Sequence, residues 1–220
     1  MRPRLSTLLL VLSCFAMAAW PAGEGQAQVN ADSRAKFPGR RVGGGTRGEC
    51  TSRLIIHLVP ESSVYAPGSS RLLGVLTGPT GQPQALELSF RPQQGTTAAT
   101  AATGGRLLPA DPNVALLLVR SPVLEGPTVW ESSYRCGAVQ ASRAPTADPM
   151  DFAVGVAPPA QSLLLPDRDA ASVDLEVQSR LNQLQRRCGA SISRRELEVV
   201  YGLADLLAEW PDQVPVRCPS

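Results

Sequence analysis

The amino-acid sequence predicts a mainly β protein: an antiparallel β-sandwich of about six or seven strands, followed by a C-terminal α-helical hairpin. Short apolar runs bounded by glycine and proline occupy the chain as far as about residue 160, a pattern typical of β-strands. After Asp167 the apolar residues recur at helical spacing instead. The chain has 20 prolines and 19 glycines but only 5% aromatic residues, which indicates many turns around a mainly aliphatic core.

The first 27 residues have the features of a cleavable secretory signal peptide. Arg2 and Arg4 supply the positive N-terminal region, and residues 5–20 are almost entirely apolar. Gly25-Gln26-Ala27 then places small residues two positions apart, which is the pattern that signal peptidase cleaves. We therefore expect cleavage near Ala27 and a mature protein that is periplasmic or secreted.

Other interpretations of this segment stay open. Cleavage can instead follow Ala18 or Ala22. The apolar segment can also remain as a membrane anchor, although its ~16 residues fall short of the ~20 that a helix needs to cross a bilayer. Lipidation at Cys14 is a further alternative, because residues 11–14 loosely resemble a lipoprotein signal. No other segment approaches transmembrane length, so we expect no integral membrane segment after cleavage.

The mature chain is close to neutral. Cleavage after residue 27 removes two arginines and one glutamate, which takes the net charge from +2 to about +1. We expect no nucleic-acid partner, since neutralising phosphates requires clusters of Lys and Arg. We expect an envelope or periplasmic partner of unknown identity, and no cofactor.

Residues 39–160 are predicted to form the β-sandwich domain, after a flexible arm over residues 28–38. The apolar runs predict six strands: Arg53 to Val59, Arg71 to Leu76, Ala85 to Phe90, Val114 to Arg120, Thr128 to Cys136 and Phe152 to Val156. The turn-forming residues 78–81 predict that the second and third of these strands form a hairpin. Residues 91–106 and 141–149 have loop-like compositions.

Residues 167–220 are predicted to form the helical hairpin and a tail. One apolar stripe at steps of three and four predicts a first helix that ends at Gly189: Val173, Val177, Leu181, Leu184 and Cys188. Ser193 and Glu196 form a capping box that predicts the start of a second helix. Its apolar stripe is Leu197, Val200, Ala204 and Leu207, and it ends before Pro211.

The cysteines predict two disulfides. Once Cys14 leaves with the signal peptide, an even set of four remains in an oxidising compartment: Cys50, Cys136, Cys188 and Cys218. We favour Cys50–Cys136 with Cys188–Cys218, because each pair then links one structural region, although three pairings are possible. A zinc site is the alternative, but the sequence has no C-x-x-C spacing and a single histidine, so we expect no metal site.

The segment RRVGGGTRG, at residues 40–48, is a candidate anion site. Glycine amides can converge on an anion, and the neighbouring arginines supply positive charge and forked donors. The residues proposed to bind a sulfate, carboxylate or acidic sugar are Arg40, Arg41, Gly43, Gly44, Gly45, Thr46 and Arg47. The alternative is structural: the glycines allow a close crossing, and an arginine supports it by donating to backbone carbonyls.

No catalytic constellation stands out, so we expect a non-enzymatic binding or accessory module. His57 lies in an apolar strand and is predicted to be a hydrogen-bonded core residue, which leaves no histidine for a Ser-His-Asp arrangement. The alternative is a carboxylate-based hydrolase acting on an extracytoplasmic glycan. Two acids about 5–9 Å apart in a cleft would support it. The acids near predicted strand ends are Glu125, Glu131, Asp148 and Asp151.

The segment PGRRVGGGTRGEC, from Pro38 to Cys50, resembles the opening signature of a cyanobacterial family known as domain of unknown function 928. Leu58-Val59-Pro60 is similar to a Leu-Val-Pro that follows in that family, and Trp130 and Cys136 resemble a later Trp and Cys at the same spacing. Residues 201–210, YGLADLLAEW, are similar in character to a helix near the family's end. The family's aromatic-rich strand after Leu-Val-Pro and its Gly-Trp step are missing here. The resemblance implies an exported cyanobacterial protein of β or β-plus-helix fold, and no particular activity.

Overall fold

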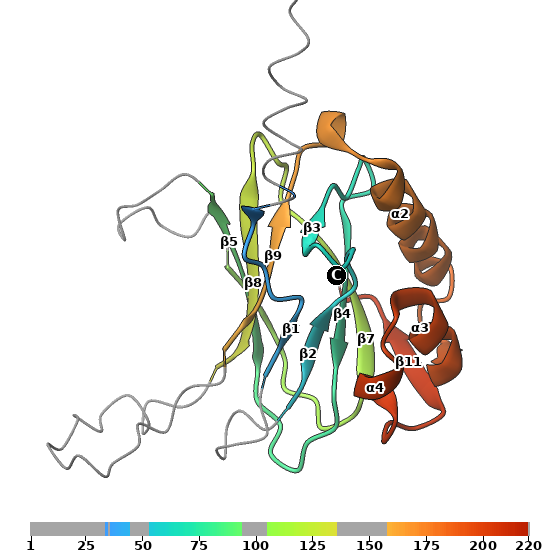
Figure 1. Ribbon diagram of the computed structural model, residues 1–220. Helices are drawn as coiled ribbons and strands as arrows, with labels where there is room; N and C mark the ends of the chain where they lie inside the picture. The colour runs from blue at the N-terminus through green and yellow to red at the C-terminus, as the bar shows by residue number, and fades with distance from the viewer. Residues whose placement is uncertain (1–33, 35, 45–52, 94–104, 136–157, 220) are drawn as a thin grey trace, which may run out of the picture.

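Two β-sheets face each other in the computed structural model, and the helices lie along the outer face of one of them (Figure 1). The structure describes residues 34, 36–44, 53–93, 105–135 and 158–219. One sheet has six strands and the other has five, so the prediction of a mainly β protein is confirmed.

The six-stranded sheet has the order β1-β2-β4-β7-β11-β10. All its pairs are antiparallel except β7 with β11, where Val216 lies opposite Leu116. In that order its strands are β1 (Val42–Gly43), β2 (Ile55–His57), β4 (Leu72–Thr77), β7 (Ala115–Arg120), β11 (Gln213–Arg217) and β10 (Ser191–Ser193).

The five-stranded sheet has the order β3-β9-β8-β5-β6. Its strands in that order are β3 (Val64–Tyr65), β9 (Ala160–Leu164), β8 (Thr128–Tyr134), β5 (Leu86–Pro92) and β6 (Gly105–Leu108). Strand β3 is parallel to β9, and the other pairs are antiparallel. Both sheets are therefore mixed, and the prediction of purely antiparallel sheets is wrong. The parallel partners are far apart in the sequence, as parallel pairing requires a long connection.

Five of the six predicted strands are confirmed, as β2, β4, β5, β7 and β8. The sixth, Phe152 to Val156, lies outside the described residues, as do the predicted loop at 141–149 and residues 94–104. The predicted hairpin of the second and third strands is wrong, because β4 lies in the six-stranded sheet and β5 in the five-stranded one. The turn residues 78–81 belong to a connection that carries the chain from one sheet to the other.

The C-terminal segment contains helices, but the predicted hairpin is not confirmed. Helix α2 (Ser172–Gln185) is followed by β10, then by α3 (Arg194–Tyr201), α4 (Ala204–Leu207) and β11. The second predicted stripe is split at Gly202, whose φ of 63° ends α3 in the left-handed conformation. The predicted cap is confirmed, because the Ser193 hydroxyl accepts from the backbone N–H of Glu196 at 3.1 Å. Strand β10 lies between α2 and α3 in the chain, and β10 and β11 both join the six-stranded sheet. The segment is therefore not a simple pair of helices.

Helix α2 packs against the six-stranded sheet. Three residues of its predicted stripe, Val177, Leu181 and Leu184, are buried, while Val173 is exposed. Gly74 of β4 allows a close approach, since a Cβ there would lie 2.9 Å from a methyl group of Leu181. No helix among the described residues is long and apolar enough to cross a membrane.

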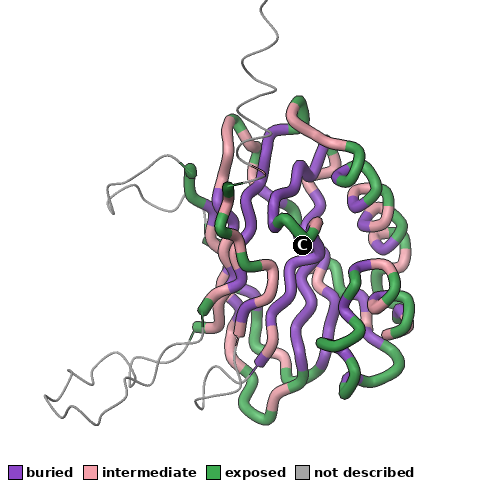
Figure 2. The backbone as a smooth tube through the Cα atoms, viewed as in Figure 1, coloured by how far each residue is buried: buried purple, intermediate pink, exposed green. Residues whose placement is uncertain are grey.

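One apolar core joins the two sheets and the helices (Figure 2). At its centre His57 of β2 is fully buried and stacks on Trp130 of β8, with ring centroids 3.5 Å apart and an interplanar angle of 6°. The two ring nitrogens lie 2.8 Å from the hydroxyl of Ser162 and 2.7 Å from that of Ser132. The prediction of a hydrogen-bonded core histidine is confirmed.

The end of the predicted arm contacts the helical region. Residues 28–33 and 35 lie outside the described part of the chain, but the Arg34 guanidinium forms an ion pair with the fully buried Asp174 carboxylate near the start of α2. The same carboxylate accepts from the backbone N–H of Ala171 at 2.7 Å. The ion pair therefore connects Arg34 of the predicted arm to the first turn of α2.

Candidate ligand pocket

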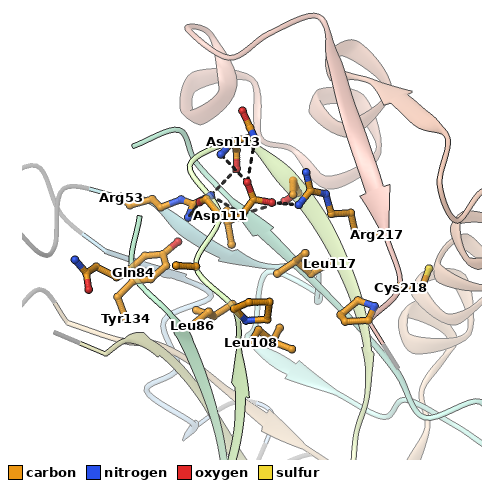
Figure 3. A pocket seen from close by; sticks show the side chains of 15 residues that line it. Arg53, Gln84, Leu86, Leu108, Asp111, Asn113, Leu117, Tyr134, Arg217 and Cys218 are labelled. Carbon is orange, nitrogen blue, oxygen red and sulfur yellow. Dashed lines mark hydrogen bonds and ion pairs between the residues drawn. The ribbon is translucent and has the colours of Figure 1, made fainter. Parts of the chain in front are cut away.

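A pocket of about 600 Å³ opens where strands of both sheets begin or end (Figure 3). The ends of β4, β7 and β11 supply one side of it, and the ends of β5, β6 and β8 supply the other. Its size lies within the range of about 300–1,000 Å³ that is usual for small-molecule sites. Charged, aromatic and aliphatic side chains line it, among them Arg53, Asp111, Arg217, Tyr134, Leu86, Leu108 and Leu117.

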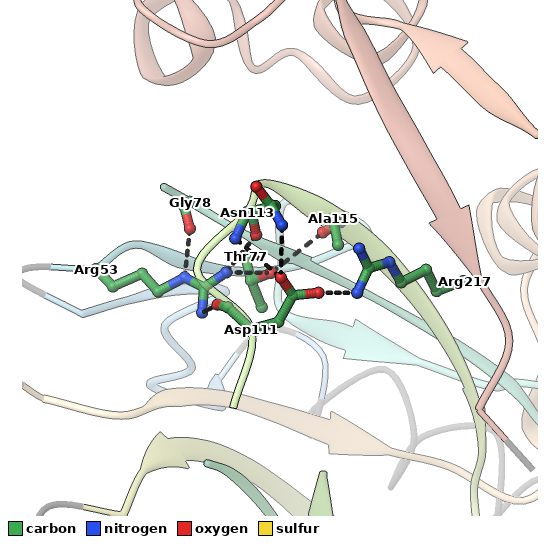
Figure 4. Close-up of polar contacts among 7 residues, drawn as sticks. All are labelled: Arg53, Thr77, Gly78, Asp111, Asn113, Ala115 and Arg217. Carbon is green, nitrogen blue, oxygen red and sulfur yellow. Dashed lines mark hydrogen bonds and ion pairs between the residues drawn. The ribbon is translucent and has the colours of Figure 1, made fainter. Parts of the chain in front are cut away.

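Arg53, just before β2, forms the polar wall of the pocket together with Asp111. The Arg53 residue is only 4% exposed, and its guanidinium donates to neutral oxygens (Figure 4). These are the carbonyls of Gly78, Asp111 and Asn113, the last at 2.5 Å, and the hydroxyl of Thr77 at 3.2 Å. Because every one of these acceptors is fixed by strand ends or their turns, the guanidinium is held rigidly.

The Asp111 carboxylate lies between two cationic residues. Its Oδ1 accepts from the backbone N–H of Asn113 at 2.9 Å and from the Asn113 side chain at 3.1 Å, which closes a turn before β7. Its Oδ2 forms an ion pair with Arg217 at the end of β11. Arg217 remains about half exposed, so it lies at the solvent side of the pocket.

Burial shifts the pKa of two residues at the pocket. Burial lowers the pKa of Arg53; the nearby Tyr134 opposes this shift and Arg217 adds to it. Burial raises the pKa of Tyr134, and Arg53 opposes that rise. The Arg53 guanidinium carbon lies 5.5 Å from the centre of the Tyr134 ring, within cation–π range. At neutral pH the pair is therefore a cation beside a neutral phenol.

The disulfide Cys188–Cys218 holds the end of β11 at the pocket. The two Cα atoms are 5.8 Å apart, and Cys218 and Pro219 both line the cavity. The prediction of this pairing is confirmed, whereas Cys50 and Cys136 lie outside the described residues. The bond joins the chain after α2 to the residue next to Arg217, which limits the movement of that wall.

The predicted anion site is described only in part, and its described residues, Arg40, Arg41, Gly43 and Gly44, do not line this pocket. Arg41 donates from its guanidinium to the carbonyls of Val59, at 3.4 Å, and Tyr201, at 3.2 Å. Gly43 packs so closely that a Cβ would lie 2.1 Å from the backbone nitrogen of Ala160.

These contacts correspond to the structural alternative for the described part of the motif. Gly44 has a φ of 82°, which favours glycine, and Arg40 pairs through its backbone with Gln161. Gly45, Thr46 and Arg47 lie outside the described residues, so anion binding by the whole motif stays a prediction.

The two candidate hydrolytic acids that the structure describes are also outside the pocket lining. Neither Glu125 nor Glu131 lines it, and Glu131 lies 3.9 Å from Arg91 in an ion pair on the five-stranded sheet. Asp148 and Asp151 lie outside the described residues. Among the described residues that line the pocket, Asp111 is the single carboxylate.

Sequence reasoning missed Arg53, Asp111 and Arg217 as a group. A signal was present at Asp111, because Asp-Pro-Asn before an apolar run is typical of a turn whose side chain bonds the backbone. Nothing in the local sequence indicates that three such distant positions meet. No family model, curated protein or solved structure matches this chain.

Proposed function

We propose that this chain is an exported, envelope-associated protein that binds a small ligand in the pocket lined by Arg53, Asp111 and Arg217, and does not catalyse a reaction of that ligand. The observation that carries the proposal is the pocket itself: about 600 Å³, with an apolar wall facing a rigid polar wall. Concave sites of this size and mixed lining are where small molecules bind. Since Arg53 and Asp111 are fixed by the protein's own hydrogen bonds, the pocket is formed before a ligand arrives.

Binding suits this pocket better than hydrolysis does. A glycosidase of the usual kind needs two carboxyl groups in one cleft, and the described lining has Asp111 alone, paired with Arg217. In the groove between α2 and α3, Glu176 and Glu196 are paired with Arg180 and Arg187.

The proposal includes export, fold type and family. The N-terminal signal pattern and the Cys188–Cys218 disulfide both suit an oxidising compartment. We assign the facing sheets to a β-sandwich with two parallel pairings. We also propose that the chain is a divergent member of the domain of unknown function 928 family, on the strength of residues 38–50.

The pocket can be tested with Nile red, an apolar and uncharged dye whose emission increases out of water. We expect the purified protein to bind the dye and the variant Ala110→Trp, which fills the pocket mouth, to lose most of that binding. Ala204→Trp is the matched control, since Ala204 is exposed on α4 and does not line the pocket. Equal binding by both variants would place the dye elsewhere and defeat the proposal.

Export is tested separately by the intact mass of the protein purified from a periplasmic extract. We expect a mass that starts near Gln28 and no reaction of thiols with an alkylating reagent until the protein is reduced. A retained N-terminus or free thiols before reduction would contradict the assignment to an oxidising compartment outside the cytoplasm.

A further inference from the structure

The charged residues of the pocket do not cancel. Its described lining contains two arginines, Arg53 and Arg217, and one carboxylate, Asp111. Asp111 forms its ion pair with Arg217, whereas Arg53 donates to backbone carbonyls and one hydroxyl. Within its described lining, the polar wall therefore carries one positive charge more than its single carboxylate neutralises.

The excess charge lies where water screens it little. Arg53 is almost fully buried beside the ring of Tyr134, and a cation in such a place is costly unless an anion approaches it. A single negative charge on a ligand would balance the wall. A second one would face the Asp111 carboxylate without a further cation among the lining residues, so a monoanion suits the wall better than a dianion.

The opposite wall of the pocket is aliphatic. Figure 3 shows Arg53, Asp111 and Arg217 grouped along one side, with Leu86 and Leu108 of the other sheet across the cavity from them, while Leu117 lies beside Arg217 on the neighbouring strand β7. The charged residues thus face two leucines, and a third leucine, Leu117, adjoins Arg217. A ligand that satisfies both walls has a hydrocarbon body and one charged end.

Arg217 is the residue best placed to receive the charged end. Its side chain is about half exposed at the solvent side, whereas every described acceptor of Arg53 is a fixed part of the fold. The planar guanidinium of Arg217 can bind a carboxylate through two N–H groups while its other edge keeps contact with Asp111. The hydrocarbon body then extends over the leucine side chains.

We infer that the pocket binds an amphipathic monoanion, a hydrocarbon chain with one carboxylate-type head at Arg217, held in the excess positive charge of Arg53. This inference rests on the proposed function, because it names the ligand class of the same pocket. It further assigns one negative charge to the ligand, which the size of the pocket alone does not indicate.

The test compares three probes that share one chain: decanoate, decanol and decyltrimethylammonium, titrated into the protein by calorimetry at neutral pH. We expect decanoate to bind at least tenfold more tightly than decanol, a difference of about 1.4 kcal/mol, and the ammonium compound not to bind. In Arg217→Gln we expect the preference for decanoate over decanol to fall severalfold, with the affinity for decanol unchanged.

Arg187→Gln is the matched control, because Arg187 also forms a partly exposed ion pair, with Glu196, but does not line this pocket. It should leave all three affinities unchanged. Equal affinities for decanoate and decanol would overturn the charge inference while leaving the pocket as a binding site. Failure of all three probes, together with failure of Nile red, would overturn both. An undiminished preference for decanoate in Arg217→Gln would also refute the inference as stated.

Discussion

The buried His57 makes the stability of this protein depend on pH in a way that can be isolated. It is the only histidine in the chain, and the structure encloses it fully between Trp130, Ser132 and Ser162. Burial lowers its pKa well below 6.5, because the enclosed ring is removed from the water that would stabilise an imidazolium ion. The folded state therefore keeps the ring neutral at a pH where the unfolded chain takes up a proton.

The sign and size of the effect follow from linkage. Above the unfolded pKa of about 6.5 both states are neutral at this ring, so its full contribution to stability is present. As the pH falls below that value the unfolded state gains a proton that the folded state does not bind. The free energy of unfolding then falls by up to about 1.4 kcal/mol per pH unit, so about 1.4 kcal/mol is lost between pH 7.5 and 5.5.

Urea unfolding at pH 7.5, 6.5 and 5.5 with the disulfides intact measures the effect. His57→Asn removes the titrating ring, and we expect its free energy of unfolding to lack the histidine component of the pH dependence, whatever its absolute stability. Ser132→Ala is the control, because it removes the hydrogen bond to the ring and keeps the ring itself. It should be less stable by about 1–3 kcal/mol at every pH and keep the full dependence. Identical pH dependence in the native protein and His57→Asn would refute the reasoning.

Three further perturbations test the disulfide, the hydrogen bonds of Arg53 and the close packing of Gly43. Replacing Cys188 and Cys218 by serine releases a cross-link with a sequence separation of 30 residues, and chain entropy predicts a loss of about 3.6 kcal/mol, measured by urea unfolding; a loss below about 1 kcal/mol would contradict it. Arg53→Met should cost more than about 3 kcal/mol, because it leaves several buried oxygens without donors, and a near-native melting temperature would count against that role. Gly43→Ala should destabilise by more than about 1 kcal/mol in the same assay, since its Cβ would collide with the backbone of Ala160, and an unchanged midpoint would show that the crossing adapts.

Several elements of the fold could be predicted from local sequence alone. The apolar runs that became β2, β4 and β7 are buried along their whole length or nearly so, and each was predicted within a few residues. The buried stripe of α2 and the Ser193 cap of α3 were also predicted, because helix periodicity and capping depend on residues three or four positions apart.

The assignment of strands to sheets could not be predicted in the same way. Residues 78–81 have the composition of a hairpin turn, yet the chain crosses to the other sheet there, because β4 pairs with β2 and β7 instead. Strand β11 follows three helices and returns to pair in parallel with β7. Nothing in a short apolar run specifies its neighbour, since that choice depends on which distant surfaces are buried together.

By itself the sequence determined the strand-forming runs, the helical stripe and the burial of His57, and it favoured the pairing of Cys188 with Cys218 among three possible pairings. Only the tertiary structure decided that Arg53, Asp111 and Arg217, from three distant positions, form one charged wall that faces Leu86 and Leu108. The physical reason is the range of the interactions involved. Periodicity and local hydrogen bonds act over a few residues, whereas a pocket exists only where strand ends from separate parts of the chain are brought together by the burial of a common core.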